Sequence, residues 1–142
     1  GKRPWRVAAD LAMPCATQNE ILEDDAKTML SNGIMAVSEG ANMPTEIEGI
    51  HHFIAAKILF APAKAANAGG VGMSGLEMSQ NSERRSWSNE ELSKMLRDLM
   101  IGIHKNCNDA GMQKDGWCNY MAGSNIAGFK KVADAMMAFG VV

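Results

Sequence analysis

Short apolar runs alternate with segments of helical periodicity in the first half of the chain. The apolar runs occupy residues 5–13, 34–37 and 58–60, and a polar loop follows each of them. Between them, residues 23–31 and a segment beginning at Thr45 space their apolar side chains as one face of a helix would. Successive strand, loop and helix units are typical of a parallel sheet with crossover helices. The sequence therefore predicts half of an open α/β sheet, with residues 5–13 as a buried strand.

Short-range signals mark the ends of the expected helices. Thr45 with Glu48, and Ser88 with Glu91, have the spacing of a capping box. Asn32-Gly33 supplies the left-handed stop that a helix end favours. Beyond a loop of small and polar residues at 61–70, the second half of the chain has a helical pattern, interrupted by a polar loop at 112–118. Its last apolar stripe consists of Ile126, Phe129, Ala133, Met136 and Met137.

Charge and composition exclude several classes of partner. The 142 residues carry 14 basic and 16 acidic side chains, a net charge of −2, and the basic residues are scattered. A nucleic-acid groove or an anionic membrane patch needs clustered Lys and Arg, so we expect neither partner. No apolar run reaches the about 18 residues of a membrane span, and no signal peptide is visible. The 3 cysteines form no C-x-x-C pair, which favours a reducing cytoplasm and argues against a zinc site.

The polar loops after the apolar runs are the best candidates for a binding site. The carboxyl ends of parallel strands meet at one edge of a sheet, where open α/β folds bind ligands. Thr17-Gln18-Asn19, Asn42 and Asn67 would then line a single crevice. Asn and Gln suit the amide and ribose hydroxyls of a nucleotide, because each offers a donor and an acceptor without charge. The alternative, that these residues only form turns, stays open.

Other motifs give weaker signals. Residues 70–75 spell G-x-G-x-x-G, but no strand directly precedes them and no following acid is presented by a strand, as a dinucleotide site requires. The spacing of the histidines gives no helical metal site. Cys15 has no His nearby in sequence, which favours a small buried thiol over a nucleophile. Lys64 is the one lysine near the expected crevice. The residues alone therefore give a nucleotide crevice without a complete catalytic set and no metal site.

Five segments nevertheless resemble a known enzyme family over almost the whole chain. The sequence is similar to glutamate dehydrogenase of the hexameric bacterial type, with the matches in the family's order. These matches are Pro14-Cys15-Ala16-Thr17-Gln18-Asn19-Glu20, Glu39-Gly40-Ala41-Asn42-Met43-Pro44-Thr45, Lys64-Ala65-Ala66-Asn67-Ala68-Gly69-Gly70-Val71, Ser74-Gly75-Leu76-Glu77-Met78-Ser79-Gln80-Asn81 and Asn125-Ile126-Ala127-Gly128-Phe129-Lys130-Lys131-Val132-Ala133-Asp134-Ala135-Met136.

The resemblance implies the C-terminal part of an oxidoreductase. The family interconverts L-glutamate with 2-oxoglutarate and ammonia, passing hydride to NAD or NADP, and the loops here look more like those of NADP-using members. Residues 1–85 would form the later half of a Rossmann-like, doubly wound and mainly parallel cofactor domain together with a pivot helix. Residues 86–142 would form C-terminal helices that pack back towards a substrate domain. A homo-hexamer is implied.

The resemblance also assigns roles to individual residues. Ala16 and Thr17 would approach the nicotinamide end of the cofactor, Asn42 its ribose or amide, and Asn67 the nicotinamide ribose. These are the expected cofactor-binding residues.

Two further positions would meet the substrate. Val71 and Ser74 match positions that contact the glutamate side chain, where a hydroxyl can donate to the γ-carboxylate. The family's catalytic lysines and aspartate belong to an N-terminal domain outside this sequence, so we expect no catalytic residue here and an inactive isolated chain. A leucine, valine or phenylalanine dehydrogenase, or a non-catalytic α/β interaction module, are the alternatives; the hydroxyl of Ser74 favours glutamate.

Overall fold

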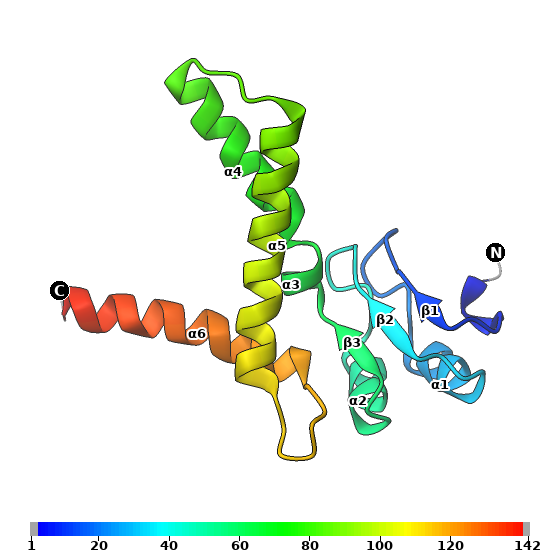
Figure 1. The fold of residues 1–142 in the computed structure, drawn as a ribbon. Coiled ribbons are helices and arrows are strands. Elements are labelled where there is room, and N and C mark those ends of the chain that lie inside the picture. Colours follow the sequence, from blue (N-terminus) through cyan, green and yellow to red (C-terminus); the bar gives the residue numbers. More distant parts are fainter. Residues whose placement is uncertain (1–2, 141–142) are drawn as a thin grey trace.

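A small parallel sheet forms the centre of the N-terminal half, in a computed structural model that describes residues 3–140. Strands β1 (Leu11–Ala12), β2 (Ala36–Ser38) and β3 (Leu59–Ala61) lie in the order β1-β2-β3 and run parallel (Figure 1). Val37 of β2 pairs with Ala12 on one side and with Phe60 on the other. The parallel α/β architecture predicted from the sequence is confirmed. Residues 1–2 and 141–142, the outer ends of the two predicted divisions, lie outside the described residues.

Helices α1 (Glu23–Ser31) and α2 (Ile47–Ala55) are the crossover connections and lie on the same face of the sheet (Figure 1). Phe53 of α2 is fully buried and its ring centroid lies 5.9 Å from that of Phe60 in β3. Burial of apolar side chains between helices and sheet is the main stabilising term for such a layer. The core cluster comprises Ile21, Ala26, Met29, Ile34, Val37, Ile50, Phe53 and Phe60.

Of the boundary signals predicted for the two crossover helices, one is confirmed and one is wrong. After α1, Gly33 has a φ of +85°, so the predicted left-handed stop is confirmed. At α2, the capping box predicted for Thr45 is wrong, because the cap position is Glu46 and no side chain caps the helix. Thr45 instead forms a parallel bridge with Ile21, and the flanking Glu46 N–H donates to the Ile21 carbonyl at 2.9 Å. The pairing of Thr45 with Ile21, which is distant in sequence, therefore replaces the capping role predicted for Thr45.

The N-terminal apolar run is not the buried strand that the sequence predicts. A 3-10 turn, η1 (Pro4–Arg6), precedes a β1 of only two residues. Val7, Leu11 and Met13 are 71%, 58% and 67% exposed. Among residues 3–140, no strand pairs with β1 on the side away from β2. Within the described residues the apolar run therefore contributes an edge strand rather than a buried one.

The second half of the chain is helical. The predicted loop at 61–70 contains the short helix α3 (Ala63–Ala66) and the first turn of α4 (Ala68–Glu83), because its small residues favour helix once Pro62 has started the turn. Helix α5 (Asn89–Gly111) begins with the predicted reciprocal capping box of Ser88 and Glu91. Helix α6 (Tyr120–Phe139) follows the predicted loop. Helix α4 lies beside the first half of α5, and α6 crosses its end (Figure 1).

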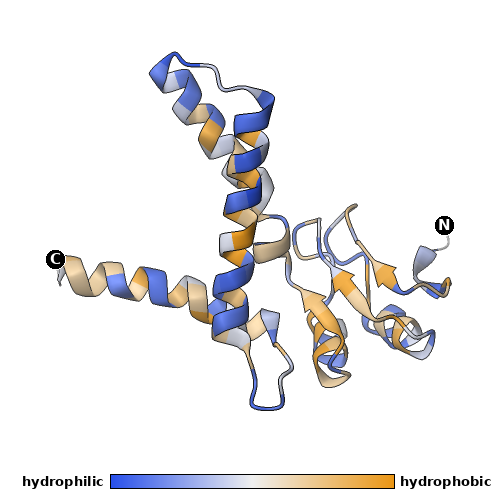
Figure 2. Ribbon diagram, viewed as in Figure 1, coloured by the Kyte–Doolittle hydropathy of each residue, from blue (hydrophilic) through white to orange (hydrophobic). Residues whose placement is uncertain are grey.

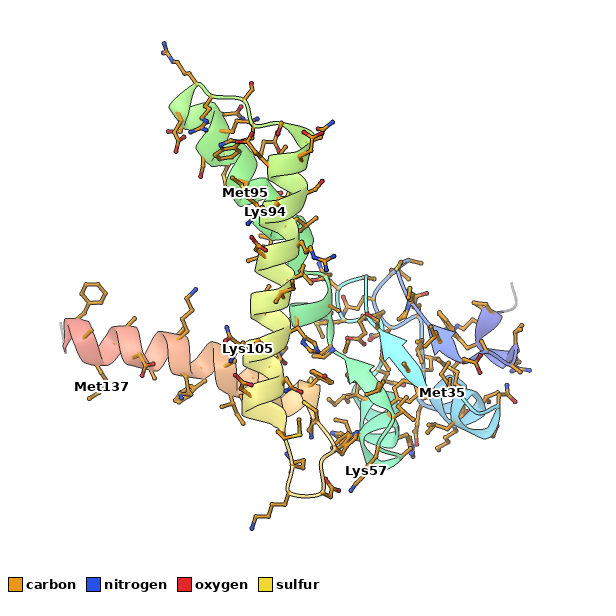
Figure 3. The ribbon with its side chains drawn as sticks, in the orientation of Figure 1. Met35, Lys57, Lys94, Met95, Lys105 and Met137 are labelled. Carbon is orange, nitrogen blue, oxygen red and sulfur yellow. The ribbon has the colours of Figure 1, made fainter. Side chains whose placement is uncertain are left out.

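Helix α6 extends away from the sheet, so its predicted apolar stripe is exposed (Figures 1 and 2). Phe129, Met136 and Met137 are 73%, 67% and 84% exposed, and Met137 points away from the rest of the chain (Figure 3). The helical period of the stripe is as predicted, but within the described part of the chain nothing covers it. No helix described here is long and apolar enough to cross a membrane.

Candidate functional site

The loops that follow the three strands meet at the carboxyl edge of the sheet. The Pro14 carbonyl, after β1, accepts hydrogen bonds from Gly40 N–H at 2.9 Å and Ala41 N–H at 3.0 Å, after β2. A second link joins the same loops, from Asn19 N–H to the Met43 carbonyl at 3.0 Å. Parallel strands deliver their following loops to one edge, as the sequence analysis expected.

Asn42 and Asn67 come together in this crevice. The side-chain amide of Asn67 donates to Asn42 Oδ1 at 2.8 Å and to the Gly40 carbonyl at 3.2 Å. This bond joins the loop after β2 to the turn at the end of α3. Two residues that the sequence places 25 positions apart are therefore held as one polar unit.

The hydrogen bonds of this pair determine which atoms face a ligand. Each primary amide has an oxygen acceptor and a two-hydrogen donor. The Asn67 donor and the Asn42 acceptor are used between the two residues. Asn42 Nδ2 and Asn67 Oδ1 make no hydrogen bond within residues 3–140, so the pair presents one donor and one acceptor.

Ala16 and Thr17 lie in the exposed loop after β1. Their backbone N–H groups donate to Glu20 Oε1, at 2.8 Å and 3.3 Å, so this carboxylate fixes the turn that carries them. Cys15 in the same loop is exposed, and the interpretation of a buried thiol is wrong. The loop passes so close to Gly40 that a Cβ there would lie 2.4 Å from Cys15 Sγ, which explains why the second loop has glycine at this point.

Glu39, which the sequence analysis did not identify as a site residue, is buried beside the crevice with an exposed fraction of only 3%. Its Oε2 accepts from Ala63 N–H at 2.8 Å, whereas Glu39 Oε1 and the buried Thr45 Oγ1 have no hydrogen-bond partner in the described chain. Burial raises the pKa of the Glu39 carboxyl, and the hydrogen bond from Ala63 N–H opposes this rise. The usable signal was a charged residue directly after an apolar strand.

A cavity of about 650 Å³ adjoins the asparagine pair. Its lining includes Glu39, Asn42, Thr45, Lys64 and Met121. The ammonium group of Lys64 donates to Asn125 Oδ1 of α6, so it is tied to the C-terminal helix. The cavity combines apolar walls with amide groups, which is typical of sites for small organic ligands.

Val71 and Ser74 lie one turn apart on α4 and are both exposed. The Ser74 hydroxyl donates to the Gly70 carbonyl at 3.3 Å, within its own helix. No described hydrogen bond joins these two residues to the asparagine pair, which is separated from them by the first turn of α4. The G-x-G-x-x-G string at 70–75 lies wholly inside this helix and therefore does not form the strand-to-helix turn that a pyrophosphate motif requires.

The histidines lie on helix surfaces. His51 Nδ1 is 3.3 Å from Glu48, His52 Nε2 is 3.1 Å from Glu23, and His104 Nε2 is 3.1 Å from the Tyr120 hydroxyl. Within residues 3–140, no three His, Cys, Asp or Glu side chains come together as a metal ion would require.

Comparison with known proteins gives a consistent result. Residues 1–140 match the model of the family described as Glutamate/Leucine/Phenylalanine/Valine dehydrogenase. The chain is 60% identical over 139 residues to an NAD(P)-specific glutamate dehydrogenase of Xylanibacter ruminicola, covering 98% of this chain and 31% of that protein. It is 54% identical over 142 residues to an NADP-specific glutamate dehydrogenase of Salmonella typhimurium, covering 100% of this chain and 32% of that protein.

A solved structure agrees with these relatives. The chain superposes on glutamate dehydrogenase of Plasmodium falciparum with a TM-score of 0.91 and 43% identity, covering 98% of this chain and 30% of that one. The chain thus spans about a third of the length of the proteins that it matches.

Proposed function

The chain belongs to the Glutamate/Leucine/Phenylalanine/Valine dehydrogenase family, and from this premise we propose that it supplies the nicotinamide side of the active site in a glutamate dehydrogenase. The complete enzyme would convert L-glutamate, water and an oxidised nicotinamide cofactor into 2-oxoglutarate, ammonium, the reduced cofactor and a proton. The observation that carries the proposal is the hydrogen-bonded pair of Asn42 and Asn67 at the carboxyl edge of the parallel sheet.

The pair fits the polar groups around a nicotinamide. Asn42 Nδ2 would donate and Asn67 Oδ1 would accept, which complements either the carboxamide or the hydroxyls of the attached ribose. When bound, the nicotinamide ring is the hydride acceptor of the reaction. Ala16 and Thr17 would line the same end of the cofactor from the loop after β1, in the turn held by Glu20. The role of these residues is to orient the ring and exclude water.

For the cofactor we propose NADP, with NAD as the second choice. The loop sequences Glu39-Gly40-Ala41-Asn42 and Ala65-Ala66-Asn67 look more like those of NADP-using members of the family. Of the two relatives described above, one is an NAD(P)-specific and the other an NADP-specific glutamate dehydrogenase. The residues that would distinguish a 2′-phosphate from a hydroxyl are expected outside this chain.

For the substrate we propose L-glutamate rather than leucine, valine or phenylalanine. The exposed hydroxyl of Ser74 has only a long 3.3 Å bond within its helix, so it can turn to donate to a γ-carboxylate. Val71 would contact the methylene groups of the same side chain. An aliphatic or aromatic substrate would offer this hydroxyl no acceptor, so it would keep only its bond to the Gly70 carbonyl once water is excluded.

The chain would perform this role as part of a larger assembly. We propose that residues 1–85 belong to the cofactor domain with α4 as its pivot helix, and that residues 86–142 pack towards a substrate domain. The exposed apolar stripe of α6 supports this division, because such a stripe is stabilised when another surface covers it. A homo-hexamer in the cytoplasm is the assembly we propose.

The second candidate is a non-catalytic interaction module that uses the same α6 stripe. It is favoured by the lack of a complete catalytic set within the described residues. Glutamate-dependent reduction of NADP distinguishes the two functions. We expect activity from the complete polypeptide that carries this sequence and none from the isolated 142 residues. An inactive complete polypeptide, or an active isolated chain, would contradict the proposal.

A further inference from the structure

Glu39 carries a buried charge for which the proposed contacts with cofactor and substrate have no use. It lies directly after β2 and is 3% exposed. Burying a carboxylate is unfavourable unless hydrogen bonds compensate it. The hydrogen bond that this side chain makes therefore indicates its structural role.

The carboxylate bonds to the short helix that ends at Asn67. Helix α3 has four residues, its cap position is Pro62, and no side chain of its own segment caps it. The N–H groups at a helix start have no partner within the helix, and a single turn is not stable by itself. Glu39 Oε2 accepts from Ala63 N–H, the first residue of α3, at 2.8 Å. Glu39 thus caps α3 from a neighbouring strand.

Three further hydrogen bonds carry this link to the asparagine pair. The Ala63 carbonyl accepts from Asn67 N–H at 2.9 Å, so both backbone groups of Ala63 are engaged. The Asn67 amide returns to the Gly40 carbonyl at 3.2 Å and to Asn42 Oδ1 at 2.8 Å. Gly40 follows Glu39 in the chain, so the bonds form a closed ring that joins the ends of β2 and β3.

The strands themselves reinforce the ring. Glu39 N–H donates to the Ala61 carbonyl at 3.1 Å, so the backbone of Glu39 bonds to the end of β3 while its side chain bonds to α3. Removal of the carboxylate would leave Ala63 N–H without its acceptor, so that the side-chain bonds of Asn67 to Gly40 and Asn42 would have to hold the end of α3 in place without the bond at its start.

We propose that Glu39 is a positioning residue, which acts through Ala63 to hold Asn67 against Asn42 in the orientation that receives the nicotinamide end of the cofactor. The inference rests on the proposed function for its ligand, whereas the link between Glu39 and α3 does not depend on it. Glu39 touches neither cofactor nor substrate in this account.

The first test needs no ligand. Hydrogen exchange of the backbone amides at 63–67 would be followed in the complete polypeptide for the wild type, Glu39→Ala and Glu39→Gln. The glutamine oxygen can still accept from Ala63 N–H, so we expect exchange about tenfold faster in Glu39→Ala and close to the wild type in Glu39→Gln. Equal exchange in all three proteins would overturn the link.

The second test measures the dissociation constant of NADPH by its fluorescence. We expect an increase of about tenfold for Glu39→Ala and of less than about threefold for Glu39→Gln. In an Asn67→Ala background, Glu39→Ala should add less than about twofold, because it acts through the residue already removed. Full additivity, or equal loss in both Glu39 variants, would overturn the positioning role.

A control separates positioning from general loss of stability. Phe53→Leu leaves a space in the core between α2 and β3 and should lower the melting temperature without changing the NADPH constant. If instead Phe53→Leu weakens NADPH binding as much as Glu39→Ala does, the positioning role is wrong. If the wild type binds neither NADPH nor NADH, the proposed function fails, and the exchange experiment still decides whether Glu39 holds Asn67.

Discussion

The side-chain amide of Asn67 donates a 2.8 Å hydrogen bond to Oδ1 of Asn42 and so joins the loops that follow two neighbouring strands. The bond fixes the orientation of both amides. It leaves Asn42 with a donor and Asn67 with an acceptor for a ligand, and it makes the two residues chemically different although both are asparagines. Substitutions that keep the shape of the side chain can therefore test the bond between the loops and the contact with a ligand independently of each other.

Asn42→Asp keeps the oxygen that accepts from Asn67 and removes the donor that faces the ligand. We expect an unchanged melting temperature and weaker NADPH binding. Asn67→Asp removes the donor itself and places a carboxylate against Asn42 Oδ1 and the Gly40 carbonyl, so it should lower the stability by about 1–3 kcal/mol. Thermal unfolding and NADPH titration of the two variants check this contrast. Equal loss of stability in both would contradict the assigned orientation of the pair.

Ser74→Ala should change substrate preference without changing the fold. The hydroxyl is exposed and makes only a 3.3 Å bond within α4. Loss of a donor to the γ-carboxylate should lower kcat/KM for glutamate by about 10-fold to 100-fold relative to an apolar amino acid such as norvaline. Ser79→Ala is a matched control, because its hydroxyl makes the same kind of bond, to Gly75 at 3.0 Å, one turn further along the helix. The same change in preference for both variants would contradict the assignment of Ser74.

Gly123→Ala should disrupt the crossing of α5 and α6. A Cβ at Gly123 would lie 2.0 Å from the Cys107 carbonyl oxygen and 3.0 Å from the Gly111 Cα, so the helices would have to separate. We expect a loss of about 3 kcal/mol in the free energy of unfolding. Gly128→Ala, on the same helix with nothing within 4 Å, should be neutral or stabilise by up to about 1 kcal/mol. Denaturant unfolding of the two variants measures the difference, and similar stabilities would show that the crossing is not close packed.

Glu39→Gln should make the protein more stable at neutral pH. Burial raises the pKa of Glu39, so the folded state binds this proton more tightly than the unfolded chain does. The contribution of Glu39 to stability then falls as the pH rises from the ordinary value of 4.5 through the raised pKa. The melting temperature of Glu39→Gln should exceed that of the wild type at pH 8, and the difference should narrow as the pH is lowered towards 4.5. A difference that is constant with pH would contradict the raised pKa.

Local signals in the sequence predicted local structure well. The capping box of Ser88 and Glu91 and the stop at Gly33 depend on residues within one helical turn, and both are present in the structure. The predicted cap at Thr45 was wrong because Thr45 pairs instead with Ile21, which is distant in sequence. The burial of residues 5–13 was also predicted wrongly, whereas the α6 stripe has the predicted helical spacing and is exposed. Their periodicity marks an apolar face but does not say whether this chain or another surface covers it.

The site was predictable to the extent that topology determines it. Parallel strands bring Asn42 and Asn67 to one edge, which the order of the elements alone implies. The bond between them depends on the geometry of two loops, and the sequence does not encode this in any local pattern. Glu39 was missed because a charged residue after a strand normally indicates a turn in solvent. Its role follows only from the N–H of Ala63, which lies beside it in the structure.

The most direct test is a crystal structure of the complete polypeptide with NADP. The account predicts that the carboxamide or ribose at the nicotinamide end lies within hydrogen-bond distance, about 2.7–3.2 Å, of Asn42 Nδ2 and Asn67 Oδ1. It also predicts that the bond between the two asparagines is retained when the cofactor is bound. A nicotinamide bound elsewhere, with the asparagine pair facing solvent, would contradict the central claim.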